Sequence, residues 1–342
     1  MENFDEYLRQ GEPNKAEKAK VWKTAIGLQQ VDGLKPSEYL IHTAKQNIEG
    51  EITFDEVKKR IDSYYQQHPT KTNEDRTEEA DKVSARIAEM LGEQTFTFSP
   101  AEYLSIHRRL FTGMYKFAGK IRNFNITKKE WVLNGETVLY ASAESLKVTL
   151  EYDFEQERKF SYKGLSETEI IEHLTHFISN LWQIHVFGEG NTRATAVFLI
   201  KYLRKLGFKN VNNDLFADHS WYFRNALVRA NYEDISRSIH RTEKYLIRFL
   251  SNLLLKGDYV LKNREMHILA DTVYDTVKQP DDTVNDTVFS LIKQNNSITA
   301  NEIGERLNMS LSTVRRKIKR LREHGNIERI GSDKTGSWRI IE

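Results

Sequence analysis

The chain has 342 residues, with 51 Lys and Arg against 49 Asp and Glu, and a formal net charge of +2. This length favours two or three domains, because single domains usually hold about 100 to 200 residues. The chain has only 17 glycines and 5 prolines, about half of average usage, which argues against a turn-rich all-β fold and favours long helices. The small net charge excludes a uniformly basic protein, so any basic surface must be local.

Several features point to a cytoplasmic protein without membrane association. No stretch approaches 18 uncharged apolar residues, so no membrane span is expected. The first ten residues, MENFDEYLRQ, are acidic and lack both the basic and the apolar region of a secretory signal. The absence of cysteine excludes disulfides, a thiolate nucleophile and cysteine-ligated zinc.

The distribution of apolar residues divides the chain into four parts. Residues 16–72 have helical spacing, and the polar stretch 67–80 is interpreted as a linker. The triplet Asp-Thr-Val occurs four times between 271 and 288, which is too short for a solenoid and indicates a polar connector. We therefore expect a mainly α protein with an N-terminal helical region at 1–75, a central domain at 80–265, a linker at 266–282 and a C-terminal domain at 283–342.

One segment of the central domain departs from the helical pattern. In residues 130–140, Asn134-Gly135 lies between β-forming residues. This dipeptide is the strongest short-range signal for a β-hairpin, because both of its residues tolerate positive φ. An isolated hairpin in a helical domain suggests a role other than building a sheet.

The last sixty residues predict a winged helix-turn-helix. Thr299 and Glu302 form a capping-box pattern that opens one helix, and Ser310 and Gly325 bracket the next. Two β-prone arms follow around residues 331–336. Residues 301–340 hold ten basic and five acidic residues, and six of the basic ones lie between 315 and 322. This favours DNA binding, with Arg315, Arg316, Lys319 and Arg320 as candidates. A protein-docking or dimerisation module is the alternative.

Residues 185–193, HVFGEGNTR, concentrate polar functional groups between two apolar helical stretches. Gly188 and Gly190 allow a tight turn that exposes backbone amides at the start of a helix, where the helix dipole favours phosphate. His185 is a base or acid near neutrality, and Glu189 is an oxygen ligand suited to magnesium. With Asn191 and Arg193 as hydrogen-bond donors, the segment holds the groups that phosphoryl or nucleotidyl transfer requires.

This segment resembles the signature of the Fic family, HxFx(D/E)GN(G/K)RxxR. It differs in having Thr192 at the glycine or lysine position and Ala196 at the second arginine. Residues 106–122 look like the family's first core helix, and the Asn-Gly segment falls where the family carries its flap. The resemblance covers roughly residues 83–250.

The resemblance implies transfer of AMP from Mg-ATP to a Ser, Thr or Tyr hydroxyl of a target protein. His185 would deprotonate the hydroxyl, and Glu189 would hold Mg²⁺. The phosphate-binding residues would be Gly188, Gly190, Asn191, Thr192 and Arg193. Asn231 would lie near the nucleotide. The flap, with Lys129, Trp131, Val132 and Leu133, would pair with the target backbone, although it could be a simple connector. A homodimer is a further expectation from the resemblance.

The N-terminal helices resemble the small antitoxin that restrains such enzymes with an (S/T)xxxE(G/N) motif. The preferred placement of this inhibitory motif is Asp32-Gly33, with Leu28 in the Ser/Thr position; Glu49-Gly50 with Lys45 is the alternative. Both depart from the motif. Because Ala196 replaces the arginine with which such a carboxylate pairs, the sequence suggests that the inhibitory ion pair has been lost.

Three functional outcomes follow from Ala196. The chain could transfer AMP without strong autoinhibition, could bind nucleotides differently, or could have lost transfer. Transfer is the favoured interpretation, because a missing phosphate contact weakens positioning more readily than it abolishes chemistry. The rival is a weakly active or inactive regulator that senses nucleotide and binds DNA, and a third hypothesis is a toxin fused to its antitoxin.

Overall fold

The structure is a computed structural model that describes residues 4–10, 12–69, 76–208, 211–269, 288–289, 291–293, 295–307, 311–323, 327–330 and 337–341. The chain divides into two compact units, Met1–Asp271 and Thr272–Glu342, and each has its own buried apolar cluster. The expectation of a mainly helical fold is confirmed. Within the described ranges, no helix combines the length and apolar character needed to cross a bilayer.

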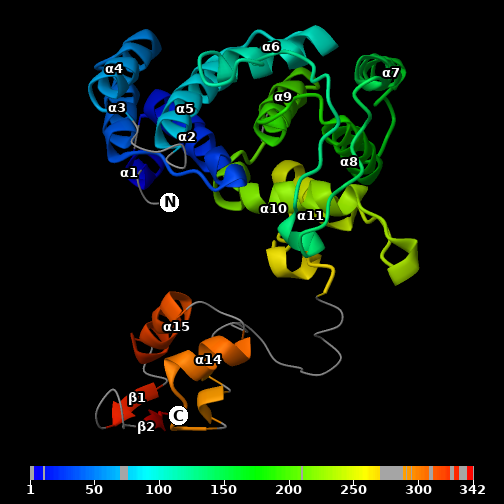
Figure 1. Cartoon of the computed structure of the whole chain (residues 1–342). Helices are drawn as coiled ribbons and strands as arrows, with labels where there is room; N and C mark the ends of the chain where they lie inside the picture. Colours follow the sequence, from blue (N-terminus) through cyan, green and yellow to red (C-terminus); the bar gives the residue numbers. More distant parts are fainter. Residues whose placement is uncertain are drawn as a thin grey trace. The chain divides into compact units, whose positions relative to one another are not determined.

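The first unit is built from α-helices joined by loops and 3-10 turns (Figure 1). Its α-helices are α1 (Asp5–Gln10), α2 (Pro13–Gly27), α3 (Glu38–Glu49), α4 (Phe54–Gln67), α5 (Thr77–Gly92), α6 (Pro100–Phe111), α7 (Leu146–Lys159), α8 (Glu167–Ile184), α9 (Asn191–Lys205), α10 (Asp214–Asn231) and α11 (Lys244–Leu255). Its 3-10 turns are η1 (Leu28–Asp32), η2 (Trp131–Leu133), η3 (Ile235–Arg237) and η4 (Asn263–Met266). Helix α9 is the central element, because nearly all of its side chains are buried and α5, α6 and α8 pack against it.

The N-terminal helices share the core of the first unit. Helix α2 packs against α5 and α10, and its Trp22 is completely buried. A capping box of Thr53 and Glu56 begins α4, so the helices expected in residues 16–72 are present. The turn η1 follows α2 directly and contacts both α9 and α10. The packing therefore holds η1, which ends at Asp32, against the central helix.

The expected linker at residues 67–80 is wrong at its C-terminal end. Helix α5 begins at Thr77, and Glu79 on its first turn is buried. The charged composition was misleading because Glu79 pairs with arginines inside the unit. Residues 70–75 lie outside the described residues, as does most of the Asp-Thr-Val repeat. The four domain bounds given above stay a prediction.

The expected β-hairpin at residues 130–140 is corrected in detail. Asn134 and Gly135 both have positive φ, 54° and 87°, as the Asn-Gly dipeptide predicted. The flanking residues do not pair as strands: η2 occupies Trp131–Leu133, and one hydrogen bond of 2.9 Å from the Glu130 amide to the Glu136 carbonyl closes the loop. Val132 and Leu133 are both buried in the core. Successive side chains of a strand point to opposite faces, so burial of both favours the 3-10 turn over a paired strand.

The second unit contains α14 (Ala300–Leu307), α15 (Leu311–Glu323), β1 (Ile327–Ile330) and β2 (Ser337–Ile340). The predicted capping box is present, because the Glu302 amide donates to Thr299 Oγ1 and the Thr299 amide donates to the Glu302 carboxylate. The strands pair antiparallel with Ile327 opposite Ile340. Val314, Ile318 and Leu321 on one face of α15 are buried. The predicted cap Ser310, Gly325 and the turn 331–336 lie outside the described residues.

The contact between α2 and α10 generates a stability prediction. A Cβ atom on Gly27 would lie 2.2 Å from the Ala217 Cα, so Gly27→Ala must push the two helices apart. We expect the free energy of unfolding to fall by about 1–3 kcal/mol in urea denaturation. Gly92→Ala is the matched control: its Cβ would meet only the Phe54 ring at 4.0 Å, and the change should be neutral or stabilising by up to about 1 kcal/mol. Equal midpoints for both variants would contradict the packing described.

Candidate functional site

The candidate site is built around the loop that joins α8 to α9. The loop turns sharply because His185 and Gly190 both adopt left-handed backbone conformations, with φ of 52° and 78°. Only glycine fits at position 190, since a Cβ there would lie 2.5 Å from the Phe111 ring. Such a conformation at a histidine is uncommon and must be held by surrounding contacts.

Three buried side chains hold this loop. The Asn191 side chain accepts from the Phe187 amide at 3.0 Å and donates to its carbonyl at 2.8 Å. Arg122 donates to the His185 carbonyl at 2.8 Å. His107 accepts from the Gly119 amide, so its Nε2 donates to the Glu189 carbonyl at 2.9 Å. Burial, with a smaller contribution from Arg193, lowers the pKa of His107 to about 4, so this histidine stays neutral in its structural role.

The contacts of His185 leave one ring nitrogen free. Its Nδ1 lies 3.3 Å from the Trp182 carbonyl, an acceptor, so Nδ1 carries the proton. The Nε2 atom is buried and has no hydrogen-bond partner among the described residues. A neutral imidazole with this tautomer presents the Nε2 lone pair as a proton acceptor.

Electrostatics keep His185 in the neutral form. Burial is the main cause that holds its pKa well below the ordinary value of 6.5, and the positive charge of Lys128 adds to it. The ring also packs against Tyr140, with ring centroids 4.2 Å apart. His185 can therefore act as a base without first losing a proton to solvent.

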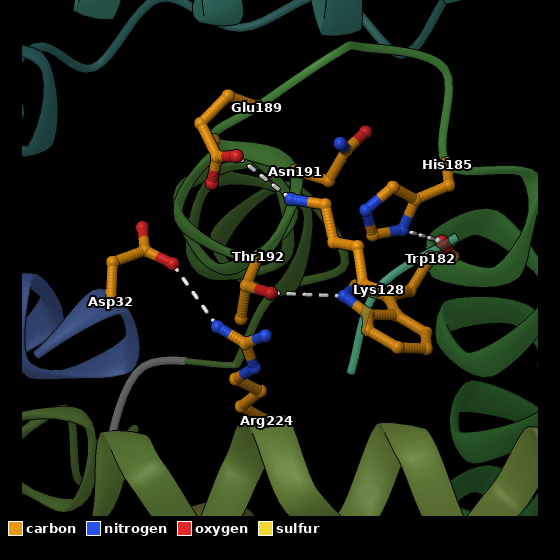
Figure 2. A pocket seen from close by; sticks show the side chains of 9 residues that line it. Asp32, Lys128, Trp182, His185, Glu189, Asn191, Thr192 and Arg224 are labelled. Carbon is orange, nitrogen blue, oxygen red and sulfur yellow. Dashed lines mark hydrogen bonds and ion pairs between the residues drawn. The ribbon is translucent and has the colours of Figure 1, made fainter. Parts of the chain in front are cut away.

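His185 opens into a small cavity together with polar side chains from four segments (Figure 2). The lining residues are Asp32, Lys128, Trp182, His185, Glu189, Gly190, Asn191, Thr192 and Arg224. The cavity volume is about 10 Å³, which is room for about one water molecule. Sites for small-molecule ligands usually measure several hundred Å³. A nucleotide could enter only if some of these side chains moved.

Glu189 is the candidate magnesium ligand on this cavity. Its carboxylate is partly exposed and lies 2.9 Å from the Lys128 ammonium (Figure 2). No cluster of three or more His, Asp or Glu able to hold a metal occurs among the described residues. One carboxylate nevertheless fits Mg²⁺, which proteins often hold through one or two carboxylates and the phosphates of a nucleotide. Lys128 would have to release Glu189 for the ion to bind.

Arg193 lies behind the cavity, although the sequence predicts it as a phosphate ligand. Its guanidinium is completely buried and is absent from the cavity lining. It pairs with Glu79 at 2.7 Å and with Asp32 at 2.8 Å. Burial alone would lower the pKa of Arg193, but these carboxylates outweigh it and raise the pKa above the ordinary value. In this conformation, carboxylates inside the protein therefore hold Arg193.

Arg224 faces the cavity instead. This residue comes from α10, outside the signature, and packs among Glu130, Asp32 and the Val31 carbonyl. Its Nη2 lies 3.1 Å from a Glu130 oxygen and its Nη1 lies 3.1 Å from Asp32 Oδ1 (Figure 2 shows the second contact). Asp32 therefore bridges two arginines that are 31 positions apart in the chain.

The structure places the carboxylates of the two candidate inhibitory motifs differently, and the inhibitory role of either one stays a prediction. Asp32 lies on the cavity, and Gly33 follows it with φ of 70°, a conformation that favours glycine. Glu49 is exposed and pairs with Lys15 at 2.6 Å, and it is not part of the cavity lining. The geometry supports Asp32. The expectation that its ion pair was lost with Ala196 is wrong, because Arg193 and Arg224 supply partners.

Several other predicted site residues have structural partners. Thr192 lines the cavity and accepts from Trp182 Nε1 at 3.0 Å. Asn231, expected near the nucleotide, is buried away from the cavity and ties α10 to Ser179 of α8 at 2.9 Å. Val132 and Leu133, expected to dock a target, are completely buried, and the Val132 carbonyl accepts from the Ile268 amide. Of the flap residues, Lys129 and Trp131 remain exposed.

Comparisons with known proteins find two domain matches in this chain. A model of the Fic/DOC family matches residues 97–203, which contain the whole loop, and a model of an HTH domain matches residues 285–335. The chain is a Fic/DOC domain protein with a C-terminal HTH domain. This confirms the resemblance that the signature suggested, and the HTH match covers the second unit's described helices and strands.

The chain is similar in sequence to one protein of assigned activity and in structure to a solved Fic family protein. The chain is 28% identical over 103 residues to protein adenylyltransferase VbhT of Bartonella schoenbuchensis, which is 30% of this chain and 20% of that protein. The chain thus spans a small part of that relative. A crystal structure of a Fic family protein from Desulfovibrio desulfuricans G20 aligns over 99% of this chain and 93% of that one, with 13% identity and a TM-score of 0.46.

Sequence reasoning missed Lys128 and Arg224 as residues of the Fic/DOC site. Lys128 precedes the residues assigned to the flap, and Arg224 lies outside the signature. A local signal for Arg224 is absent because its partners, Asp32 and Glu130, are 192 and 94 residues away in the chain. Only the fold brings the three side chains together.

The HTH domain presents part of its predicted basic surface. Arg315 and Lys319 are exposed on α15. Arg316 and Arg320 lie on the same helix, and their side chains lie outside what the structure describes. Because Arg315 and Lys319 are four residues apart, they lie about one turn apart on the same face of α15.

The burial of His185 predicts an unusual titration. We expect its imidazole NMR signals to show no protonation midpoint as the pH is lowered from 8 through the ordinary value of about 6.5, because charging the ring inside the protein costs the hydration that a free histidine retains. The signals can be assigned by their loss in His185→Gln. The chain unfolded in urea is the control, since its histidines should titrate near the ordinary value of about 6.5. A midpoint near 6.5 for His185 in the folded chain would contradict this.

Proposed function

We propose that this chain transfers AMP from Mg-ATP to a hydroxyl group on a target protein. The observation that carries the proposal is the unpartnered Nε2 of His185, buried beside Glu189, Asn191 and Thr192 on one cavity. A free lone pair in that position serves to remove a proton from an attacking group. The Fic/DOC match and the similarity to a protein adenylyltransferase support the choice of reaction.

In the proposed step, the target hydroxyl oxygen attacks the α-phosphorus of ATP, and its proton moves to His185 Nε2. The bond between the α-phosphorus and the bridging oxygen to the β-phosphate breaks, and pyrophosphate leaves. Mg²⁺, when bound, would neutralise phosphate charge, with Glu189 as its protein ligand. The amides at the start of α9 would face the anion, where the helix dipole favours negative charge.

The test is labelling by ATP that carries the radioactive label on the α-phosphate. We expect the purified chain, incubated with Mg²⁺ and a cell extract, to transfer label to protein, and His185→Ala to lower this transfer at least a hundredfold, as removal of a general base usually does. Label on the γ-phosphate should not transfer. His240→Ala, which removes an exposed histidine, is the matched control.

The rival function predicts a different result. A nucleotide-sensing regulator would bind ATP and DNA with His185→Ala intact, and it would transfer no label in any variant. Absence of His185-dependent label, with ATP binding seen by calorimetry, would therefore overturn the transferase proposal. If truncation of residues 1–75 made expression toxic to the host, the fused toxin and antitoxin interpretation would gain support.

We also propose that the HTH domain binds DNA. The observation that favours this second function is the pair of exposed basic residues on α15, Arg315 and Lys319. They belong to residues 301–340, whose ten basic and five acidic residues give a net charge of +5. Phosphate contacts made by such residues release counterions, so binding weakens as salt rises. A helix of this kind is placed to reach the major groove in helix-turn-helix proteins.

Salt dependence tests the DNA proposal. For a duplex bound by the full chain, the plot of log K against log salt should lose about one unit of slope for each substitution, so Arg315→Gln with Lys319→Gln should reduce it by about two. Lys147→Gln, an exposed lysine of the first unit, is the control and should change nothing. An unchanged slope in the double variant would mean that α15 does not contact DNA phosphates.

A further inference from the structure

The arginine that lines the cavity is Arg224, which is not part of the signature. Helix α9 carries Ala196 where the Fic pattern has its second arginine, and Ala196 is completely buried. Arg193, the remaining signature arginine, does not line the cavity. Arg224, from α10, does line it, beside Asn191 and Thr192 (Figure 2). Of the two arginines that contact Asp32, the one that faces the cavity therefore comes from outside the signature.

Asp32 holds the position between the two arginines that an anionic ligand would need. One of its oxygens lies 2.8 Å from Arg193 Nε and the other lies 3.1 Å from Arg224 Nη1. The contact with Arg193 is an ion pair without hydrogen-bond alignment, because Asp32 Oδ2 and Arg193 Nε both lack a hydrogen-bond partner among the described residues. A carboxylate bound this way resembles a phosphate that offers separate oxygens to two guanidinium groups.

The charges of the cluster balance only while Asp32 is present. Three guanidinium groups face three carboxylates in a connected set of contacts: Arg76, Arg193 and Arg224 with Asp32, Glu79 and Glu130. If Asp32 withdrew, Glu79 and Glu130 would remain against the three arginines, so the set would carry one positive charge in excess. Such a charge is costly unless another anion replaces the carboxylate.

Glu130 would keep Arg224 oriented during such an exchange. This carboxylate is buried and contacts both Nε and Nη2 of Arg224, whereas Asp32 contacts only Nη1. The Nη1 end could therefore change partners while the other side of the guanidinium stays fixed. A guanidinium that is held in advance loses less freedom when it binds phosphate.

We infer that Arg224 is a phosphate-binding residue of this site that compensates for the arginine missing at Ala196, and that Asp32 competes with the phosphate chain of the nucleotide for it. The inference rests on the proposed function for the identity of the ligand. It also explains the small volume of the cavity, since Asp32 is one of its walls. Withdrawal of Asp32 opens the space and frees the charge in one movement.

Calorimetry with Mg-ATP, and separately with inorganic tripolyphosphate, tests this inference without relying on transfer. We expect Asp32→Asn to raise the affinity for both ligands about tenfold or more, because the amide keeps the shape but not the charge. Arg224→Gln should lower it by a similar factor. In the double variant, most of the gain from Asp32→Asn should disappear, since the residue that Asp32 blocks is gone. AMP, which lacks the outer phosphates, should respond less than threefold.

Two controls separate this effect from a change in fold. Asp218→Asn removes the ion pair of Asp218 with Lys23, which also joins α10 to α2, and should leave ATP affinity unchanged. Arg224→Lys keeps a positive charge beside Glu130 but loses the fork of donors, so it should fold as the parent and still bind ATP more weakly. Thermal denaturation with and without Mg-ATP checks folding and binding together.

Three results would overturn the inference. The first is equal ATP affinity in Asp32→Asn and Asp218→Asn. The second is the same gain in affinity from Asp32→Asn with and without Arg224, and the third is failure of both ligands to bind to Asp32→Asn. A gain that depends on Arg224, in a chain that never transfers label through His185, would keep the inference and reject the transferase proposal. The two proposals therefore fail by different measurements.

Discussion

The ion pairs of Asp32 connect the parts of the first unit that matter for its chemistry. Asp32 ends η1, which follows directly from the N-terminal helices, and its oxygens reach Arg193 at the start of α9 and Arg224 in the middle of α10. Without these contacts two buried guanidinium groups would share too few carboxylates. The end of the N-terminal region, one wall of the cavity and a contact of each arginine thus meet at one side chain.

The signature loop itself is rigid for a different reason. Its left-handed residues are held by hydrogen bonds between the side chains of Asn191, Arg122 and His107 and backbone atoms, and Asp32 takes part in none of these bonds. The amides at the start of α9 and the imidazole of His185 are therefore organised before any ligand arrives, which lowers the cost of binding and reaction. Access to the site and the chemistry of the site rest on separate sets of contacts.

The sequence predicted those features whose cause is local. The Thr299 capping box, the positive φ of Asn134-Gly135 and the turn at Gly190 follow from the residues at those positions and their immediate neighbours. The preference for Asp32 over Glu49 stays a prediction, although Asp32 lines the cavity and Glu49 does not. The strands expected beside Asn134 failed because burial of Val132 and Leu133 outweighed their β-propensity.

What the sequence could not supply was set by contacts between distant segments. Arg224 and Lys128 carry no motif, and Glu79 looked like part of a polar linker until the fold placed it against Arg193. The same limitation made Ala196 misleading: a missing arginine in α9 suggested a missing ion pair, whereas α10 provides another arginine for Asp32.

Because α10 supplies an arginine to the cavity, the alanine at position 196 of α9 does not leave Asp32 without a partner. A buried carboxylate that pairs with two arginines is stable only while both remain, and breaking a buried pair commonly costs about 3–5 kcal/mol. An incoming triphosphate would recover most of that cost, because it presents oxygens to the same guanidinium groups. The balance between the closed and the ligand-bound site is therefore a small difference between two well-paired states, and the concentration of nucleotide can decide it.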